Sequence, residues 1–135
     1  MEVSASFSKG SQFIVKARGH EVVCDQPANN GGEDTGMTPP EFLLASLATC
    51  AGYYAVQYLK TRHLDASGVT VKVTAEKAAQ PARLGSFRIE VTVPPVEERH
   101  HAALLRAVKG CIVHNTLLGL PSIDIALFAP ESVSA

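Results

Sequence analysis

Apolar and polar residues alternate with a period of two in the first part of the chain. The alternation covers residues 3–7 and 13–17, with a Ser-Lys-Gly-Ser turn between them, and a third short segment follows at residues 20–24. Successive side chains of a β-strand point to opposite faces, so this pattern predicts three short strands. Residues 25–37 are crowded with Gly, Asn and Asp and predict a loop.

A long apolar helix is predicted next. Thr38 lies three residues before Glu41, which is the capping-box pattern, and two prolines occupy the positions between them. Residues 42–59 carry no charge, and their apolar side chains fall on every face of a helix. Such a segment is about 27 Å long, enough to cross a hydrocarbon core. Because polar and small residues dilute it and amphipathic strands flank it, we expect a buried core helix and no membrane span.

The second half of the chain predicts a hairpin and two further helices. Alternation at residues 69–73 and 87–93 is typical of a long antiparallel hairpin with one face on the core. Residues 96–109 carry apolar side chains at helical spacing, and a glycine then ends the helix. Residues 112–118 predict a short helix, and alternation at residues 123–127 predicts a last strand.

Composition places the chain, residues 1–135, in a single globular domain. Hydrophobic residues make up 46% of it and charged residues 19%, a balance that supports a sizeable core and excludes a largely disordered chain. The 12 basic and 13 acidic residues give a net charge of −1, and the basic residues are scattered. We therefore expect no nucleic-acid partner.

The start of the chain and the number of cysteines both favour a cytoplasmic protein. The first residues lack the basic segment and apolar run of a secretory signal. The 3 cysteines are an odd number and are spaced too widely for a disulfide scaffold. In a reducing compartment they are expected to be thiols, so any disulfide would be transient and functional.

The three cysteines have different predicted settings. Cys50 lies in the long helix about 13.5 Å from its start, beyond the reach of the helix dipole. It is either an inert core thiol or is activated by a cation from elsewhere. Cys111 opens the short helix, where free backbone N–H groups favour a thiolate, although a core position fits equally well. Cys24 is assigned to the core, and the other two suggest an attacking and a resolving pair.

Two segments resemble the cysteine motifs of the OsmC/Ohr family of thiol peroxidases. They are residues 32–50, Gly-Glu-Asp-Thr-Gly-Met-Thr-Pro-Pro-Glu-Phe-Leu-Leu-Ala-Ser-Leu-Ala-Thr-Cys, and residues 111–117, Cys-Ile-Val-His-Asn-Thr-Leu. Residues 18–20, Arg-Gly-His, are similar to a further family segment, less closely. The resemblance implies an α+β OsmC-like fold with antiparallel sheets and a long buried central helix. It also implies an intertwined homodimer with active sites at the subunit interface, and no cofactor.

The same resemblance assigns roles to individual residues. It implies that Cys50 is the peroxidatic cysteine, which reduces a hydroperoxide substrate, and that Cys111 resolves it as a disulfide. Arg18 would be the activating cation, and an external dithiol reductant would reset the enzyme. Glu41 is one residue out of step with the family glutamate and lies nine helical positions from Cys50, on the opposite face. It acts through Arg18, acts across the dimer, or is only the capping-box residue. Ile112 stands where the family often has proline.

A second possible function is a small-molecule binding protein without peroxidase turnover. Its support is an aromatic set on the apolar helix, although such residues are more often part of a core. In that case Cys50 only lines an interface pocket. The aromatic residues are Tyr53, Tyr54 and Tyr58.

A third possible function is a metal site. Cys111 and His114 have the spacing of a ligand pair, which His100 and His101 would have to complete. Adjacent residues on a helix diverge by about 100°, so the two neighbouring histidines cannot both point at one ion. We therefore expect no metal.

Overall fold

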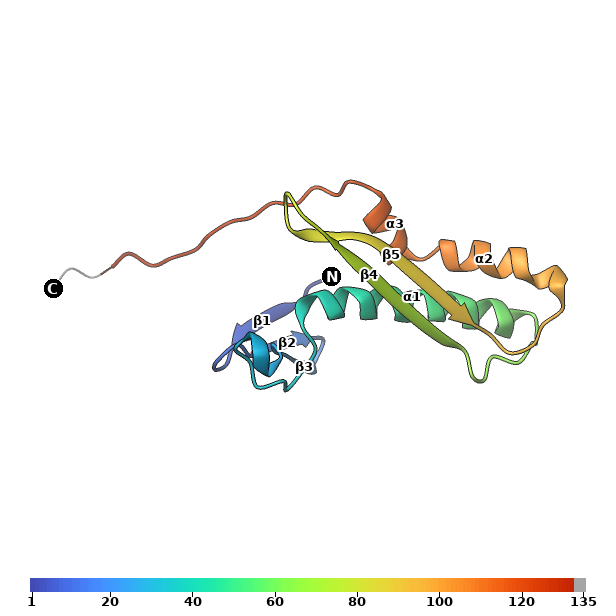
Figure 1. Ribbon diagram of the computed structural model, residues 1–135, viewed down its shortest axis with the longest axis horizontal. Helices are drawn as coiled ribbons and strands as arrows, with labels where there is room; N and C mark the ends of the chain where they lie inside the picture. The colour runs from blue at the N-terminus through green and yellow to red at the C-terminus, as the bar shows by residue number, and fades with distance from the viewer. Residues whose placement is uncertain (133–135) are drawn as a thin grey trace.

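The computed structural model describes residues 1–132 as two antiparallel sheets and three α-helices (Figure 1). Two short 3-10 helices, Ala28–Asn30 and Glu98–His100, complete the regular structure of these residues. The expectation of an α+β fold with antiparallel sheets is confirmed. In chain order the elements are β1 (Ser4–Phe7), β2 (Phe13–Ala17), β3 (His20–Cys24), α1 (Pro39–Thr61), β4 (Thr70–Ala78), β5 (Arg83–Thr92), α2 (His101–Lys109) and α3 (Ile112–Leu118).

The first sheet lies beside the N-terminal end of α1 (Figure 1). Its strand order is β1-β2-β3, and both pairs are antiparallel, with Phe13 opposite Cys24. The rings of Phe7 and Phe13 meet edge to face with centroids 5.8 Å apart. Arg18 and Gly19 form the tight turn between β2 and β3, with φ angles of 51° and 84°. The predicted strands are thus confirmed, and Arg18 lies in a turn.

Helix α1 begins where the capping box predicts. The Thr38 hydroxyl accepts a hydrogen bond from the Glu41 backbone N–H at 3.4 Å, and Glu41 Oε1 accepts one from the Thr38 backbone N–H at 3.0 Å. Two of the backbone N–H groups that the start of a helix leaves without partners, those of Thr38 and Glu41, are therefore satisfied reciprocally. The hydrogen bond from the Thr38 backbone N–H, followed by one from the Thr38 hydroxyl, holds the pKa of the Glu41 carboxyl below its ordinary value, because both stabilise its charged form.

Only one face of α1 is buried within the chain. By length and composition α1 could cross a membrane, but its buried face packs against the β4–β5 hairpin and α2 as in a core helix. On another face Tyr53 is 59% exposed. Within a single chain one hairpin and two short helices cover only one side of α1, and cover of its other faces by a homodimer stays a prediction. The buried residues are Leu47, Ala51, Ala55, Tyr58 and Leu59.

The hydrophobic core lies between α1, the hairpin and α2. Leu59 and Ala55 are fully buried and form a cluster with Tyr58 and Leu104 of α2. The Tyr58 hydroxyl lies 2.9 Å from Nδ1 of His100, so a polar contact also joins the end of α1 to the segment before α2. The hairpin contributes an apolar face at the predicted spacing, in which Val71 is opposite Val91 and Val73 is opposite Ile89.

Two segments differ from the sequence-based expectation. Residues 96–109 are predicted as one helix, but Glu98–His100 form a 3-10 turn and the α-helix α2 starts only at His101. Residues 123–127 form no strand, and the chain after α3 runs away from the body as an extended tail (Figure 1). A strand needs a neighbour for its backbone hydrogen bonds, and the tail has none within residues 1–132. Five large apolar side chains of the tail are at least 80% exposed: Leu120, Ile123, Ile125, Leu127 and Phe128.

We predict that Leu59→Ala lowers the free energy of unfolding by roughly 3 kcal/mol, because it removes a fully buried side chain and leaves a cavity. Leu105→Ala is the matched control, since Leu105 is 56% exposed and should cost less than about 0.5 kcal/mol. Chemical denaturation of both variants, with cysteines reduced and at equal protein concentration, measures the difference. Equal losses in the two variants would show that the core does not centre on Leu59.

Candidate active site

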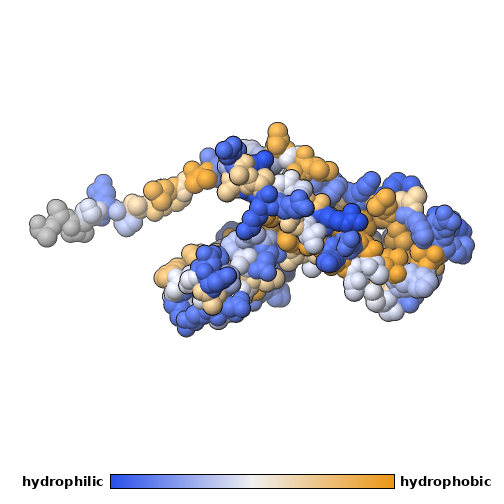
Figure 2. Space-filling model, viewed as in Figure 1, coloured by the Kyte–Doolittle hydropathy of each residue, from blue (hydrophilic) through white to orange (hydrophobic). Residues whose placement is uncertain are grey.

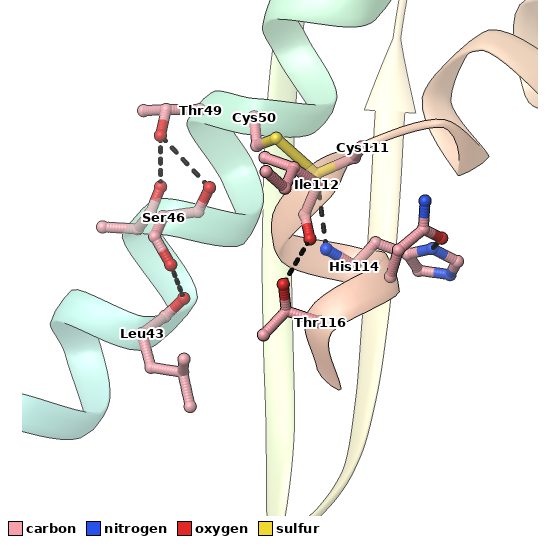
Figure 3. The surroundings of a disulfide bond; sticks show 10 residues. Leu43, Ser46, Thr49, Cys50, Cys111, Ile112, His114 and Thr116 are labelled. Atoms are coloured by element: carbon pink, nitrogen blue, oxygen red, sulfur yellow. Dashed lines mark hydrogen bonds between the residues drawn. A yellow bond between two sulfur atoms is a disulfide. The ribbon is translucent and has the colours of Figure 1, made fainter. Parts of the chain in front are cut away.

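Cys50 of α1 and Cys111 before α3 are joined by a disulfide bond (Figure 3). They are separated by 61 positions in the sequence, and their Cα atoms are 5.8 Å apart, inside the usual range for a disulfide. The two cysteines that the sequence suggests as an attacking and a resolving pair are therefore in direct contact.

The end of α2 places Cys111 beside Cys50. Helix α2 closes with hydrogen bonds from Gly110 N–H to the Ala107 carbonyl at 3.1 Å and from Cys111 N–H to the Val108 carbonyl at 3.2 Å. Cys111 then has extended backbone angles and is the N-cap of α3. Its Sγ accepts a hydrogen bond from the His114 backbone N–H at 3.5 Å. The sulfur thus replaces the hydroxyl that usually caps a helix.

The hydroxyl groups near Cys50 do not provide its sulfur with a hydrogen bond of this kind. The neighbouring hydroxyls both donate to helix carbonyls, Ser46 Oγ to Leu43 O at 2.7 Å and Thr49 Oγ1 to Ala45 O at 2.8 Å (Figure 3). Neither hydroxyl therefore donates to sulfur in this arrangement. Cys50 is only partly buried, whereas Cys111 is 1% exposed.

An apolar groove lies next to the cysteine pair. It has a volume of about 880 Å³ and runs between β5, α2 and α3. Leu47, one helical turn before Cys50, and His114, three residues after Cys111, both line it. Its lining is mainly aliphatic, with three basic side chains in the remainder, so it suits an apolar ligand. The basic side chains are His101, Lys109 and His114.

Arg18 and Glu41 do not meet the cysteines within one chain. Arg18 is exposed in the β2–β3 turn, and among residues 1–132 its side chain has no hydrogen-bond or ion-pair partner. Glu41 is exposed at the start of α1, where Oε1 accepts from the Thr38 backbone N–H and from the Thr38 hydroxyl at 2.9 Å. In a single chain, Glu41 is therefore a capping residue.

The remaining candidates have ordinary structural settings. Cys24 is a free thiol at the end of β3 and is only half-buried, so its assignment to the core is wrong. It forms an isolated β-bridge with Met37, where a loop passes alongside. Within residues 1–132 no group of three or more His, Cys, Asp or Glu side chains is close enough to hold a metal ion. Tyr58 is buried in the core, and Tyr53 faces outward.

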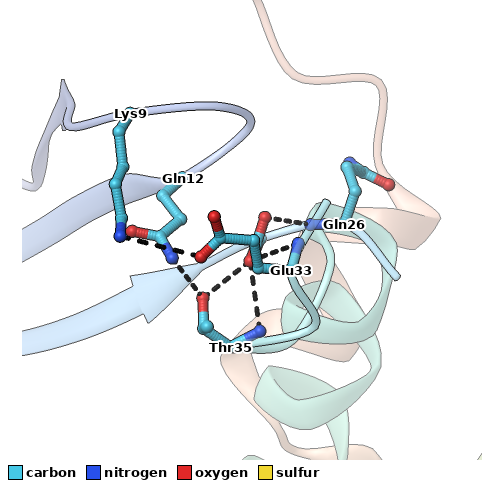
Figure 4. A network of polar contacts seen from close by, with 6 residues as sticks. Lys9, Gln12, Gln26, Glu33 and Thr35 are labelled. Carbon is cyan, nitrogen blue, oxygen red and sulfur yellow. Dashed lines mark hydrogen bonds and ion pairs between the residues drawn. The ribbon is translucent and has the colours of Figure 1, made fainter. Parts of the chain in front are cut away.

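A buried carboxylate that the sequence analysis did not single out organises the loop before α1 (Figure 4). Asp25 is 1% exposed and accepts hydrogen bonds from the Thr35 hydroxyl and from the backbone N–H groups of Gln26, Glu33 and Thr35. The Thr35 hydroxyl, followed by these N–H groups, lowers the pKa of Asp25 to about 2. Gly32 is required here, because a Cβ would collide with the Gln26 carbonyl. The only sequence signal was an Asp directly before a Gly- and Asn-rich loop.

Comparison with known proteins identifies the family. Residues 31–126 match the model of the family described as OsmC-like protein, and the chain therefore belongs to the OsmC-like family. A comparison with curated proteins finds no match.

Solved structures show the same fold. An OsmC-like protein from Mycoplasma pneumoniae superposes with a TM-score of 0.73 at 21% identity, over 88% of this chain and 87% of that chain. The organic hydroperoxide resistance protein OsmC from Legionella pneumophila gives 0.66 at 16% identity, over 87% and 88%. An organic hydroperoxide resistance protein from Elizabethkingia anophelis gives 0.62 at 18% identity, over 88% and 89%. At these identities the likeness establishes the fold.

We predict that Asp25→Asn lowers the Tm near pH 7 and that the difference from the wild type narrows as the pH falls. The folded-state pKa of about 2 is below the ordinary value of 3.8, so the ionised carboxylate stabilises the fold above that value. This stabilisation is lost as the pH falls from about 4 towards 2. Thermal melts of both proteins between about pH 5 and pH 2 test this.

Asp34→Asn is the control, because Asp34 is an exposed carboxylate in the same loop. Its Tm should match the wild type across this pH range. A pH-independent difference for Asp25→Asn would mean that ionisation of Asp25 is not what stabilises the loop.

Proposed function

We propose that this protein reduces organic hydroperoxides through a Cys50 sulfenic acid that Cys111 resolves as a disulfide. The observation that supports this most directly is the contact between the two cysteines across 61 positions, in a chain of the OsmC-like family. Two of the solved structures with this fold are named organic hydroperoxide resistance proteins. The apolar groove beside the cysteines would accept the organic part of such a substrate.

The proposed chemistry has two steps within the protein. The Cys50 thiolate attacks one peroxide oxygen, the O–O bond breaks, and the leaving alkoxide takes up a proton to become an alcohol, which leaves Cys50 as a sulfenic acid. The Cys111 thiolate then attacks the Cys50 sulfur, and the departing hydroxide is protonated to water. An external dithiol reduces the disulfide and closes the cycle. We place this cycle in the cytoplasm, where such disulfides are transient.

Cys50 needs a cation, and we propose that Arg18 of a second copy supplies it. Within one chain Arg18 lies in the β2–β3 turn of the sheet beside the start of α1, whereas Cys50 is eleven residues into that helix. A homodimer is supported by the apolar surface that one chain leaves exposed, at Tyr53 on the outer face of α1 and along the tail, which Figure 2 shows. Such surfaces mark interaction sites.

The groove favours a second candidate function, a small-molecule binding protein without peroxidase turnover. Its volume falls within the range of ordinary ligand sites, and its lining is mainly aliphatic. Loss of free thiols on addition of a hydroperoxide separates the two functions, because a binding protein would keep Cys50 reduced.

We predict that Cys50→Ser abolishes the reduction of an alkyl hydroperoxide in an assay coupled to dithiothreitol, because no other residue replaces its sulfur. Cys111→Ser should consume one hydroperoxide per site and then stall or over-oxidise, because the sulfenic acid still forms but is not resolved. Cys24→Ser is the control and should turn over like the wild type. Mass spectrometry of the oxidised proteins follows each product. Undiminished turnover by Cys50→Ser would remove Cys50 from the mechanism.

We predict that Arg18→Ala lowers the rate of sulfenic acid formation by roughly tenfold, the change in thiolate expected when a thiol pKa rises by one unit. If Arg18 acts across a dimer, mixing Arg18→Ala with Cys50→Ser restores activity, because the mixed dimer holds one complete site. Refolding the two variants together, with each refolded alone as control, measures how far the activity rises above that of either variant alone. A monomer by light scattering, or no recovery from a mixed dimer, would contradict this arrangement.

A further inference from the structure

The two cysteines of the disulfide differ in how deeply they are buried within one chain. Cys111 is 1% exposed, whereas Cys50 is partly exposed on α1. A thiolate that cleaves a disulfide attacks one sulfur along the line of the S–S bond and expels the other. Because Cys111 is buried, the surrounding protein restricts the approach of a reductant to this residue. Attack on Cys50 meets the less buried of the two cysteines in the chain.

We propose that the dithiol reductant attacks the sulfur of Cys50 and expels Cys111 as the first thiolate. This inference rests on the proposed function, because it describes the step that resets the enzyme. It also assigns a role to the backbone N–H of His114, which stabilises the sulfur of Cys111 as it leaves.

The hydrogen bonds around the two sulfurs favour the same order of attack, with Cys50 attacked and Cys111 expelled. The His114 N–H donates to Cys111 Sγ at 3.5 Å and stabilises the negative charge that arrives there when the S–S bond breaks. The hydroxyls next to Cys50, those of Ser46 and Thr49, donate to carbonyls instead. Because the sulfur that bears negative charge more easily leaves faster, Cys111 is the better leaving group.

The electrons and atoms of this step balance with a dithiol alone. One thiolate of the reductant bonds to Cys50 Sγ, the Cys50–Cys111 bond breaks, and its electron pair goes to Cys111, which then takes up a proton. The second thiolate of the reductant then attacks the reductant sulfur that is bonded to Cys50, and this attack releases the Cys50 thiolate. The dithiol ends as a cyclic disulfide, and both cysteines are reduced.

A monothiol that cannot cyclise stops the reaction at the mixed disulfide and reveals which cysteine was attacked. The full chain with Cys24→Ser is oxidised with diamide, which forms the disulfide without hydroperoxide. It is treated briefly with 2-mercaptoethanol, quenched with acid, alkylated with N-ethylmaleimide and mapped by mass spectrometry. We expect mercaptoethanol on Cys50 and maleimide on Cys111, in roughly tenfold excess over the reverse pattern.

The role of the His114 N–H is tested with a matched pair of proline variants. His114→Pro removes the donor, whereas Ile112→Pro keeps it and places proline at the first helical position, where proline is tolerated. In a Cys50→Ser background, alkylation against pH should show a higher Cys111 pKa for His114→Pro only. With Cys50 present, reduction should be roughly threefold slower for His114→Pro only, as a one-unit change in pKa with a Brønsted coefficient near 0.5 implies.

The outcomes separate this inference from the proposed function. A chain that forms the disulfide with diamide but turns over no hydroperoxide contradicts the proposed function, and the adduct map still tests the order of attack. Mercaptoethanol found mainly on Cys111, or equally on both cysteines, would overturn the proposed order. Equal alkylation profiles for the two proline variants would overturn the role of the His114 N–H.

Discussion

Packing of α1 against the hairpin and α2 fixes where the two sulfurs meet. Leu59 and Leu104 hold the two helices together in the core, and α2 then ends at Gly110, immediately before Cys111. The position of Cys111 relative to Cys50 therefore follows from the direction of α2, which the core sets. Helix α3 has no fully buried residue of its own and packs against α1, so the buried Cys111 at its start is its deepest attachment to the body.

Within one chain, α1 is covered on one side only. The face of α1 that carries Tyr53 and the apolar tail both lie open to solvent, in a chain whose composition supports a sizeable core. Apolar surface of this kind lowers the free energy of the protein when it is covered, at about 25 cal/mol per Å². In the proposed homodimer, a second copy would cover these surfaces and would bring Arg18 to Cys50.

Much of the fold was predictable because its signals are local. The capping box of Thr38 and Glu41, the alternation of the strands and the glycine after α2 each depend on a few neighbouring residues, and each is found where expected. The alternation of residues 123–127 predicts a strand, and this prediction is wrong because residues 1–132 supply no strand to pair with it. Asp25 was missed because its partners at Glu33 and Thr35 meet it only after the loop closes.

For the candidate site, the sequence by itself determined which chemistry is possible, and the tertiary structure decided which groups can take part. Cys50 and Cys111 were recognisable from their motifs, because a thiol before a short helix and a thiol after a capping box are local features. Their contact, the burial of Cys111 and the partial exposure of Cys50 within one chain were decided by tertiary packing. Contacts across 61 positions depend on how helices and strands pack in three dimensions, and no local spacing in a sequence records that.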